Sequence, residues 1–251
     1  MAKADIARVK NLARKEVRVR EGLFVAEGMK LVSELIASSL TATVYALPEA
    51  AAKLPPCNVV QIVTAKEMER ISHLKTPSDV LALVQIPAYP AAAPARDTLS
   101  LMLDGVQDPG NLGTIIRLAD WFGIGDIFCS SATVDCFNPK VVQATMGAIV
   151  RVRVHYGDLA VWLDAACRDR LPVYGTFLEG KNVYTENLST ECVILLGSEG
   201  HGISPGAAAR VTEKLVIPPY PADTQRGESL NVAIAAAIIC AEFRRFPARV
   251  F

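Results

Sequence analysis

The sequence lacks closely spaced cysteine pairs and has no long hydrophobic run. It holds six cysteines among 251 residues, and no two of them form a Cys-x-x-C pair. A zinc site or a disulfide framework is therefore not expected, and this cysteine usage is typical of a reducing cytosol. The apolar run at residues 232–241 is too short for a membrane-spanning helix, which needs roughly 20 residues. Because the N-terminal residues are charged and contain no hydrophobic signal segment, we expect a cytoplasmic protein that does not enter a membrane.

The chain also lacks a net charge, since 26 basic residues balance 26 acidic ones. Whole-chain charge therefore does not indicate a nucleic-acid partner. Residues 1–30 are different, because they contain four acidic residues but eight basic ones: Lys3, Arg8, Lys10, Arg14, Lys15, Arg18, Arg20 and Lys30. This excess indicates either a basic face that meets phosphate or an ordinary solvated helix face. Arg244, Arg245 and Arg249 form a second basic group near the C-terminus.

The pattern of the first 88 residues alternates between helix and strand. Apolar residues at helical spacing predict a helix over 26–38, and a second helix is expected over 65–73. Short apolar runs predict strands at 41–47, 57–64 and 80–87. The proline-rich stretch that follows, "PAYPAAAPARD", is typical of a semi-rigid linker. We therefore expect a small α/β domain over 1–88, a linker over 89–98 and a second domain over 99–251.

The second domain shows a longer α/β series. Apolar strands alternate with amphipathic helices from residue 99 to the final helix that begins after residue 231. This alternation predicts a mostly parallel sheet with helices on both faces. Ligands in such sheets bind beyond the carboxyl ends of the strands. Three turns become candidates for a site, namely those after Val106, after Leu196 and after Ile217.

The first candidate turn reads "DPGNLGTIIR". Asp108 to Asn111 has turn chemistry, and Asn111 is expected to cap the helix that follows. Gly113 allows a close approach of other atoms, and Arg117 lies near the second helical turn. The alternative is a plain helix cap followed by a surface arginine.

The second candidate turn, "LLGSEGHGIS", carries Gly197, Gly200 and Gly202 at the end of an apolar strand. Glycines at this place let the backbone approach a ligand closely. The spacing matches neither G-x-G-x-x-G nor a P-loop. Glu199 is expected to face the ligand space, although it could instead cap a helix that begins near Ser204.

The third candidate turn, "ESLNVA", opens the last helix with polar residues. Ser229 is expected to cap that helix, and free N–H groups at its start can hold an acceptor. Asn231 offers both a donor and an acceptor. Together the three turns indicate a site for a small polar ligand that has an adenine or a similar flat part.

In order and content, these turns resemble the motifs of the SpoU (TrmH-type) branch of the SPOUT RNA methyltransferases. Members of this branch methylate ribose 2′-hydroxyls with S-adenosylmethionine. Asn111 with Gly113 and Arg117 is similar to the first motif, "LLGSEGHGIS" to the second, and "VIPP" followed by "SLNVA" to the third. "FNPKVVQATMGA" is similar to the segment between the first two motifs. The N-terminal "GLFVAEGMKLVSE" is similar to a substrate-binding domain with a ribosomal-protein-like fold that binds RNA.

The resemblance implies a fold and a set of site residues. It implies a deep trefoil knot in the C-terminal domain, and a homodimer with sites at the subunit interface. It implies a cofactor-binding set of Thr176, Gly197, Gly200, Ile217 and Leu230. It also implies a polar catalytic set of Asn111, Arg117, Glu199, Ser229 and Asn231. The loop "PPYPADTQRGE" is longer than the family's usual connection, so Gln225 to Gly227 could add cofactor contacts.

Several functional alternatives stay open at this point. The resemblance implies that Arg117 is the general base. A guanidinium group keeps its proton near neutral pH, so a role in orienting the substrate or in binding phosphate is equally expected. The extra N-terminal domain favours ribosomal RNA over transfer RNA as the substrate. The alternatives are an RNA-binding protein that has lost methyl transfer, an enzyme that methylates a transfer-RNA ribose, and one that methylates an RNA base.

Overall fold

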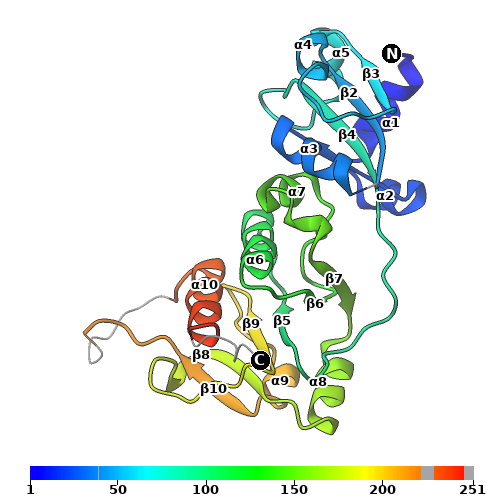
Figure 1. The fold of residues 1–251 in the computed structure, drawn as a ribbon. Helices are drawn as coiled ribbons and strands as arrows, with labels where there is room; N and C mark the ends of the chain where they lie inside the picture. The colour runs from blue at the N-terminus through cyan, green and yellow to red at the C-terminus, as the bar shows by residue number, and fades with distance from the viewer. Residues whose placement is uncertain (39, 222–228, 246–251) are drawn as a thin grey trace. The chain divides into compact units, whose positions relative to one another are not determined.

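The computed structural model describes residues 1–38, 40–221 and 229–245, which divide by their contacts into two compact units (Figure 1). The small unit consists of Met1–Tyr89 together with Asp135–Val150. The large unit consists of Pro90–Val134 and Arg151–Phe251. The expected domain boundaries stay a prediction, but residues 135–150 pack in the small unit although they lie within the range 99–251.

The small unit is built on a four-stranded sheet with the order β1-β4-β2-β3. Strand β4 pairs antiparallel with β1 and β2, and β2 pairs parallel with β3. The strands are β1 (Leu23–Glu27), β2 (Thr41–Ala46), β3 (Val60–Ile62) and β4 (Val80–Gln85). The helices are α1 (Lys3–Asn11), α2 (Lys15–Glu21), α3 (Met29–Ala37), α4 (Pro48–Ala51), α5 (Ala65–Ile71) and α7 (Pro139–Thr145), followed by the 3₁₀ turn η1 (Ala148–Val150).

Strand β4 shows why both faces of this sheet are buried. Val80, Ala82 and Val84 join a core with α3, whereas Leu81 and Leu83 join a second core with α1 and α5. Successive side chains of a strand point to opposite faces, so a continuous apolar run requires cover on both sides. The sequence "VLALV" therefore places β4 inside the unit.

The helix predicted over 26–38 begins later in the structure. Leu23–Glu27 forms strand β1, every residue of which is buried, and the helix α3 starts at Met29. Gly28 separates the two elements with a φ of 107°, a conformation that side-chain-bearing residues rarely adopt. The prediction was wrong at this boundary because the apolar residues of a buried strand extend the helical pattern of α3.

The segment 135–150 completes one core of the small unit. The ring of Phe137 lies 4.9 Å from that of Phe24 on β1, measured between centroids. Val142 on α7 is fully buried in the same core as Phe24 and Val32. The small unit therefore depends on residues that the chain supplies long after the linker.

The large unit contains a six-stranded sheet in which every paired strand is parallel. Its order is β10-β8-β9-β5-β6-β7, which confirms the predicted α/β class and parallel sheet. The strands are β5 (Leu99–Asp104), β6 (Asp126–Ser130), β7 (Arg153–Gly157), β8 (Val173–Asn182), β9 (Cys192–Gly197) and β10 (Glu213–Val216). The helices are α6 (Pro109–Trp121), α8 (Leu159–Arg168), α9 (Pro205–Ala208) and α10 (Val232–Phe243).

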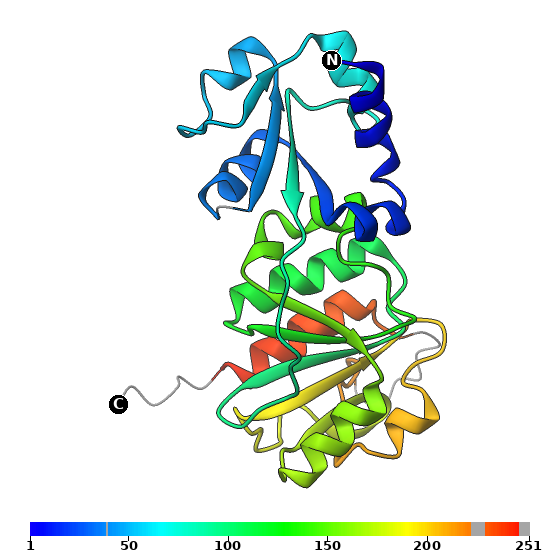
Figure 2. The same cartoon turned by 90° about the vertical axis from the view of Figure 1, so that its right-hand side faces the viewer.

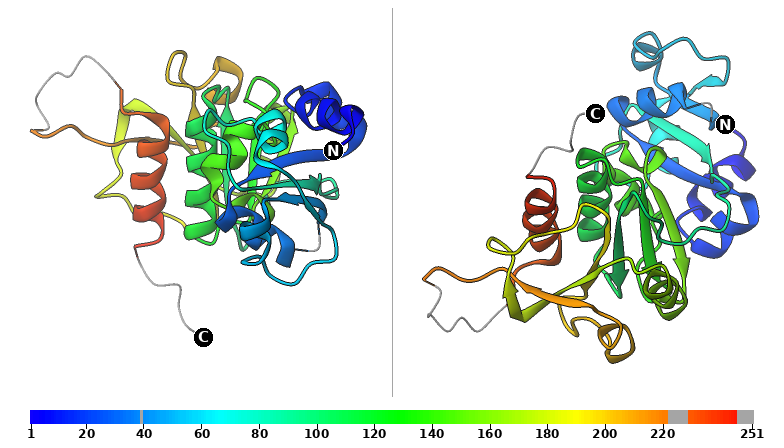
Figure 3. Two further views of the ribbon diagram at one scale, coloured as in Figure 1. Left: turned by 90° about the horizontal axis from the view of Figure 1, so that it is seen from above. Right: turned by 60° about the horizontal axis from the view of Figure 1, so that its bottom comes forward.

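The helices of the large unit cover both faces of its sheet. Figure 2 shows α6 and α10 on one side of the strands and α8 with α9 on the other. Helices α6 and α10 run side by side, as both views of Figure 3 show. This arrangement places the starts of α6 and α10 next to each other, near the carboxyl ends of β5 and β9.

None of the six cysteines, all of which lie in the described part of the chain, forms a disulfide bond. Burial raises the pKa of Cys192 and of Cys240 to about 12, so both thiols stay protonated near neutral pH and are poor nucleophiles. Among the described residues no group of acidic, histidine and cysteine side chains could hold a metal ion. In the same part of the chain, no helix has the length and apolarity to cross a membrane.

We predict that Val142→Ala destabilises the small unit by about 1–3 kcal/mol, because it removes two buried methyl groups and leaves a cavity. Hydrogen exchange of the β1 and β4 amides measures this effect, because those strands share the core with Val142. Val19→Ala is the matched control, since Val19 is 68% exposed on α2 and its truncation should change stability by less than about 0.5 kcal/mol. Equal exchange rates in the two variants would contradict the assignment of 135–150 to this core.

Candidate functional site

The candidate site lies where three loops leave the parallel sheet of the large unit. Asp104 and Gly197 end β5 and β9 as register partners, so the loops that follow begin side by side. The first loop leads into α6, and the second contains Glu199. The third runs from β10 towards α10, whose first residue is Val232.

Asn111, Glu199 and Asn231 form a hydrogen-bonded set that we call the amide–carboxylate cluster. The Nδ2 atom of Asn111 donates to Oε1 of Glu199 at 3.0 Å. The Nδ2 atom of Asn231 donates to Oδ1 of Asn111 at 3.0 Å and also to Oε1 of Glu199. The backbone N–H of Val232 donates to the same Glu199 oxygen at 3.3 Å. The structure therefore brings together three of the predicted catalytic residues from three parts of the chain that are far apart in sequence.

Two expected helix caps are wrong. Asp108, not Asn111, caps α6, because its Oδ1 accepts from the N–H of Asn111 at 2.8 Å. Asn231, not Ser229, caps α10, because its Oδ1 accepts from Ala233 N at 3.0 Å and from Ile234 N at 3.2 Å. Capping by Asp108 leaves the Asn111 amide free to reach Glu199. Asn231 serves both roles, since its oxygen caps the helix while its NH₂ group joins the cluster.

The alternative role of Glu199 as the cap of α9 is wrong, because no side chain caps that helix. The N–H of Ser204, which precedes α9, donates to Oδ2 of Asp104 at 2.8 Å. The Glu199 carboxylate is thus committed to the amide–carboxylate cluster, and it is exposed to solvent there.

Arg117 and Ser229 stand apart from the cluster. Arg117 is exposed on α6 and has no hydrogen-bond or ion-pair partner among the described residues. Ser229 is exposed as well, and it lines a cavity. Both side chains are therefore open to a ligand, and among the described residues neither forms a hydrogen bond with Asn111, Glu199 or Asn231.

A cavity of about 830 Å³ lies beside the cluster. Its lining includes four of the five predicted cofactor-binding residues and two of the predicted catalytic ones: Thr176, Gly197, Ile217, Leu230, Glu199 and Ser229. Gly200 is not part of the lining, and the space around its α-carbon is open. The volume and the mixture of apolar and polar walls are typical of a small-molecule site.

Part of the cavity wall was not predicted. Phe177, Leu178 and Glu179 line it, and the strand that carries them, β8, continues to Asn182. The extension pairs with β10 across a shift of register at Lys214 and Leu215. The sequence does not predict the end of β8, because "EGKN" is polar and lacks the alternation of apolar and polar residues that indicates a half-buried strand. The predicted contacts of Gln225 to Gly227 lie outside the described residues.

A smaller cavity of about 400 Å³ lies at the carboxyl ends of β5, β6 and β7. Its polar walls include Asp104 and Asp158, each of which already accepts a backbone N–H. None of the predicted site residues lines it. The larger cavity is therefore the candidate, because it alone of the two adjoins the amide–carboxylate cluster.

Gly197 is required by the fold of the loop that separates β9 from α9. A Cβ atom at this position would lie 2.1 Å from the carbonyl carbon of Gly202 and 2.3 Å from the nitrogen of Ile203. The close approach arises because Ser198 and Gly202 exchange two backbone hydrogen bonds, at 3.1 and 2.9 Å. The loop therefore folds back on the end of β9, and this turn places Glu199 beside the cavity.

The large unit combines a parallel sheet with a cavity near the carboxyl ends of its strands and with the amide–carboxylate cluster beside that cavity. These features are typical of an α/β enzyme that binds a small molecule. The chain belongs to the SpoU rRNA methylase family, whose model matches residues 98–241. Residues 3–82 match the model of an MRM3-like substrate-binding domain. The family predicted from the three motifs is thus confirmed.

Similar proteins span nearly the whole chain. The 23S rRNA (guanosine(2553)-2′-O)-methyltransferase of Bacillus subtilis is 30% identical over 239 residues, which cover 94% of each chain. A solved structure from Porphyromonas gingivalis, assigned to the TrmH family of RNA methyltransferases, is 38% identical with a TM-score of 0.88 and covers 98% of each chain. An rRNA methyltransferase from Sinorhizobium meliloti, solved with bound AdoMet, is 29% identical with a TM-score of 0.81; the match covers 97% of this chain and 95% of that one.

We predict that Gly197→Ala lowers the melting temperature of the large unit, because the new methyl group would overlap the backbone of Gly202 and Ile203. The change should cost more than about 2 kcal/mol, since neither neighbour is a flexible side chain. Gly200→Ala tests the same loop without a clash, and its melting temperature should stay within about 2 °C of the original. Thermal unfolding followed by circular dichroism measures both, and equal losses would refute the steric argument.

Proposed function

We propose that the protein transfers a methyl group from S-adenosylmethionine to a ribose 2′-hydroxyl of ribosomal RNA. The observation that carries this proposal is the amide–carboxylate cluster, because Glu199 lines the cavity and also holds the two asparagine amides. The relative from Bacillus subtilis is a 23S rRNA 2′-O-methyltransferase, which supports the same reaction and RNA class.

The cavity suits S-adenosylmethionine in size and chemistry. Apolar walls from Leu196, Ile217 and Ile239 suit a flat adenine ring, and the exposed backbone near Gly197 offers hydrogen-bonding groups. Thr176, Gly197, Ile217 and Leu230 are the residues that would hold the cofactor, whereas Gly200 stays a prediction that the lining does not support. When bound, S-adenosylmethionine supplies an electrophilic methyl group.

The protein's own residues then have to align the ribose and assist loss of its proton. Alignment of reacting groups can supply about 7–11 kcal/mol of a barrier. The Glu199 carboxylate fixes Asn111 and Asn231, so their amides present a rigid polar edge beside the cavity. Ser229 offers a further hydroxyl at the cavity wall.

Arg117 is best suited to bind an RNA phosphate next to the target ribose. It is exposed, and it lies two helical turns from the start of α6 without a partner among the described residues. A guanidinium group keeps its proton near neutral pH and holds phosphate through paired N–H groups. We therefore assign Arg117 an orienting role rather than the role of general base.

The small unit is proposed to bind the RNA. Seven of the eight basic residues in 1–30 are exposed, and the eighth, Arg18, is buried. Arg8 forms an ion pair with Glu21, which lowers the attraction that this part of the face exerts on phosphate. The match to an MRM3-like substrate-binding domain supports this assignment.

The C-terminal basic group lies in the large unit. Arg244 of this group donates to the carbonyl of Phe122 at 3.0 Å, and Arg249 lies outside the described residues.

We also propose that the protein is a homodimer that associates through α6 and α10. The two helices run side by side, and they expose Trp121 (84%) and Ile234 (53%) on the large unit (Figure 3). Large exposed apolar side chains on neighbouring helices are typical of a protein interface.

Helix α10 contacts α6 and β9. This position supports the expected trefoil knot, in which the chain returns from β10 to the middle of the sheet. A cytoplasmic location remains part of this proposal.

We predict that Arg117→Ala lowers methyl transfer by about 10- to 100-fold, whereas Arg117→Lys retains part of the activity because it keeps the positive charge. Near-normal transfer in both variants would refute a role of Arg117 in the reaction. Arg168→Ala on α8 is the control, because it removes an exposed arginine from the other face of the sheet. Nuclease digestion and mass analysis of the labelled nucleotide measure transfer and show whether a ribose or a base is modified.

Calorimetric titration with S-adenosylmethionine separates the remaining alternatives. Binding to wild type and to Arg117→Ala with similar affinity is expected, since Arg117 does not line the cavity. No detectable binding to wild type would instead favour an RNA-binding protein without methyl transfer. Comparison of ribosomal and transfer RNA as methyl acceptors tests the proposed RNA class.

We predict that Trp121→Asp combined with Ile234→Asp converts a dimer into a monomer, because the interface would have to bury unpaired carboxylates. Val161→Asp is the matched control, since Val161 is 62% exposed on α8, away from the proposed interface. Sedimentation velocity measures the mass of all three proteins. A wild-type monomer, or a double variant that still dimerises, would refute the interface.

A further inference from the structure

The wall of the large cavity carries negative charge. Glu179 and Glu199 both line it, and among the described residues the lining contains no lysine, arginine or histidine. The partners of Glu199 are asparagine amides and one backbone N–H, which are neutral groups and leave its charge uncompensated. In the same part of the chain, Glu179 has no hydrogen-bond or ion-pair partner. A ligand in this cavity therefore meets two carboxylates that no described cation neutralises.

Glu179 lies at the cavity because the pairing of β8 with β10 is interrupted. Gly175 pairs with Lys214, but the next pair joins Lys181 to Leu215, so residues 176–180 of β8 lie opposite no residue of β10. Residues 176–179 of this stretch line the cavity. An interruption of this kind bends a strand and changes the direction of its side chains.

Gly180 closes the interruption. A Cβ atom at this position would lie 2.6 Å from the carbonyl oxygen of Lys214 and 2.8 Å from the carbonyl carbon of the same residue. Strand β10 therefore approaches the bare backbone of β8 directly after Glu179, which only glycine allows. This close approach fixes the backbone from which the Glu179 side chain extends.

The lysines beside the interruption do not neutralise Glu179. Lys181 forms an ion pair with Glu213 at 2.8 Å. The Nζ atom of Lys214 lies 4.9 Å from the centroid of the Phe177 ring. Glu179 is exposed to solvent, and an exposed glutamate is negatively charged near neutral pH. Its charge is therefore available to a ligand in the cavity.

The two forms of the proposed cofactor differ in charge. S-adenosylmethionine has a positive sulfonium group in addition to its zwitterionic amino-acid part, whereas S-adenosylhomocysteine, the spent form, has a neutral thioether in the same place. A charge acts over about 8–10 Å in physiological salt, so a carboxylate in the wall attracts a sulfonium group without touching it. Negative charge in the wall thus favours the methylated form over the spent one.

We propose that Glu179 is a specificity-determining residue, which makes the cavity select S-adenosylmethionine over S-adenosylhomocysteine by charge. The inference rests on the proposed function, because it takes the cavity to be the cofactor site. The selection promotes replacement of the spent cofactor after each transfer. Glu199 contributes to the same field, but it also holds the amide–carboxylate cluster. Glu179 is therefore the position at which the charge can be changed without disturbing that cluster.

Calorimetric titration with both cofactor forms tests this proposal without depending on catalysis. We expect Glu179→Gln to weaken the binding of S-adenosylmethionine about 3- to 10-fold and to change that of S-adenosylhomocysteine by less than about twofold, because only the former has a net charge. Glu179→Asp keeps the charge, so the ratio of its two Kd values should stay within about twofold of the wild-type ratio. Glu191→Gln is the matched control, since it removes an exposed carboxylate directly before β9 that does not line the cavity.

Salt provides a second measurement. An increase in ionic strength from about 0.05 M to about 0.5 M should reduce the preference of wild type for S-adenosylmethionine more than that of Glu179→Gln, because salt screens the carboxylate. An equal loss of affinity for both cofactor forms in Glu179→Gln would overturn the proposal, since it would indicate a contact with a group that the two forms share. Unchanged affinity for both forms would overturn it as well, and in both cases the proposed function would stand. A wild-type protein that does not bind S-adenosylmethionine would refute the proposed function and this inference together.

Discussion

The carboxylate of Glu199 is the point at which three loops of the large unit meet. One oxygen accepts from two asparagine amides and from the first N–H of α10, so it joins the ends of β5 and β9 to the return from β10. A neutral side chain at this position would hold these donors less strongly, since hydrogen bonds to a charged acceptor are roughly twice as strong as neutral ones. The turn at Gly197 brings the carboxylate into place, because no residue with a Cβ atom fits against Gly202. The geometry of the site therefore follows from one glycine and one charge.

Much of the large unit could be predicted because its strands are buried on both faces. Predominantly apolar runs such as "LSLML" and "CVILL" require cover on two sides, which indicates a parallel sheet between helices. The carboxyl ends of parallel strands meet at one edge, so the motif loops had to converge. The identity of the helix caps could not be predicted in the same way. Asp108 and Asn111 both have cap chemistry, and only the tertiary position of Glu199 decides which of them is free.

The small unit was less accessible to prediction, for two physical reasons. The apolar residues of strand β1 and of helix α3 follow one another closely in the sequence, and only Gly28, which has a positive φ, separates the two elements. The second reason is that part of its core is remote in sequence, since Val142 packs against residues more than 100 positions earlier. Charge counting has the same weakness: Arg18 adds to the basic total of the N-terminus, yet its burial removes it from any phosphate-binding surface.

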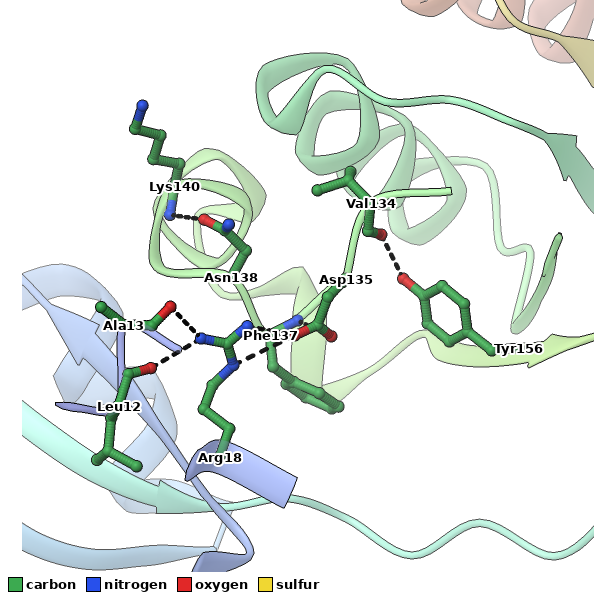
Figure 4. Close-up of polar contacts among 9 residues, drawn as sticks. All are labelled: Leu12, Ala13, Arg18, Val134, Asp135, Phe137, Asn138, Lys140 and Tyr156. Atoms are coloured by element: carbon green, nitrogen blue, oxygen red, sulfur yellow. Dashed lines mark hydrogen bonds and ion pairs between the residues drawn. The ribbon is translucent and has the colours of Figure 1, made fainter. Parts of the chain in front are cut away.

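The contribution of residues 135–150 to the small unit has a consequence for the modular reuse of this architecture. The chain passes between the units at the linker, at residue 134 and again at residue 150, so no single cut releases either of them intact. In a chimaera made by exchanging residues 1–88 alone, Phe137 and Val142 would pack against a core from another protein. Asp135 would also lose its ion-pair partner Arg18 (Figure 4) unless the new sequence carried an arginine at the same position. The N-terminal part and the β6–β7 connection must therefore be inherited, or engineered, together.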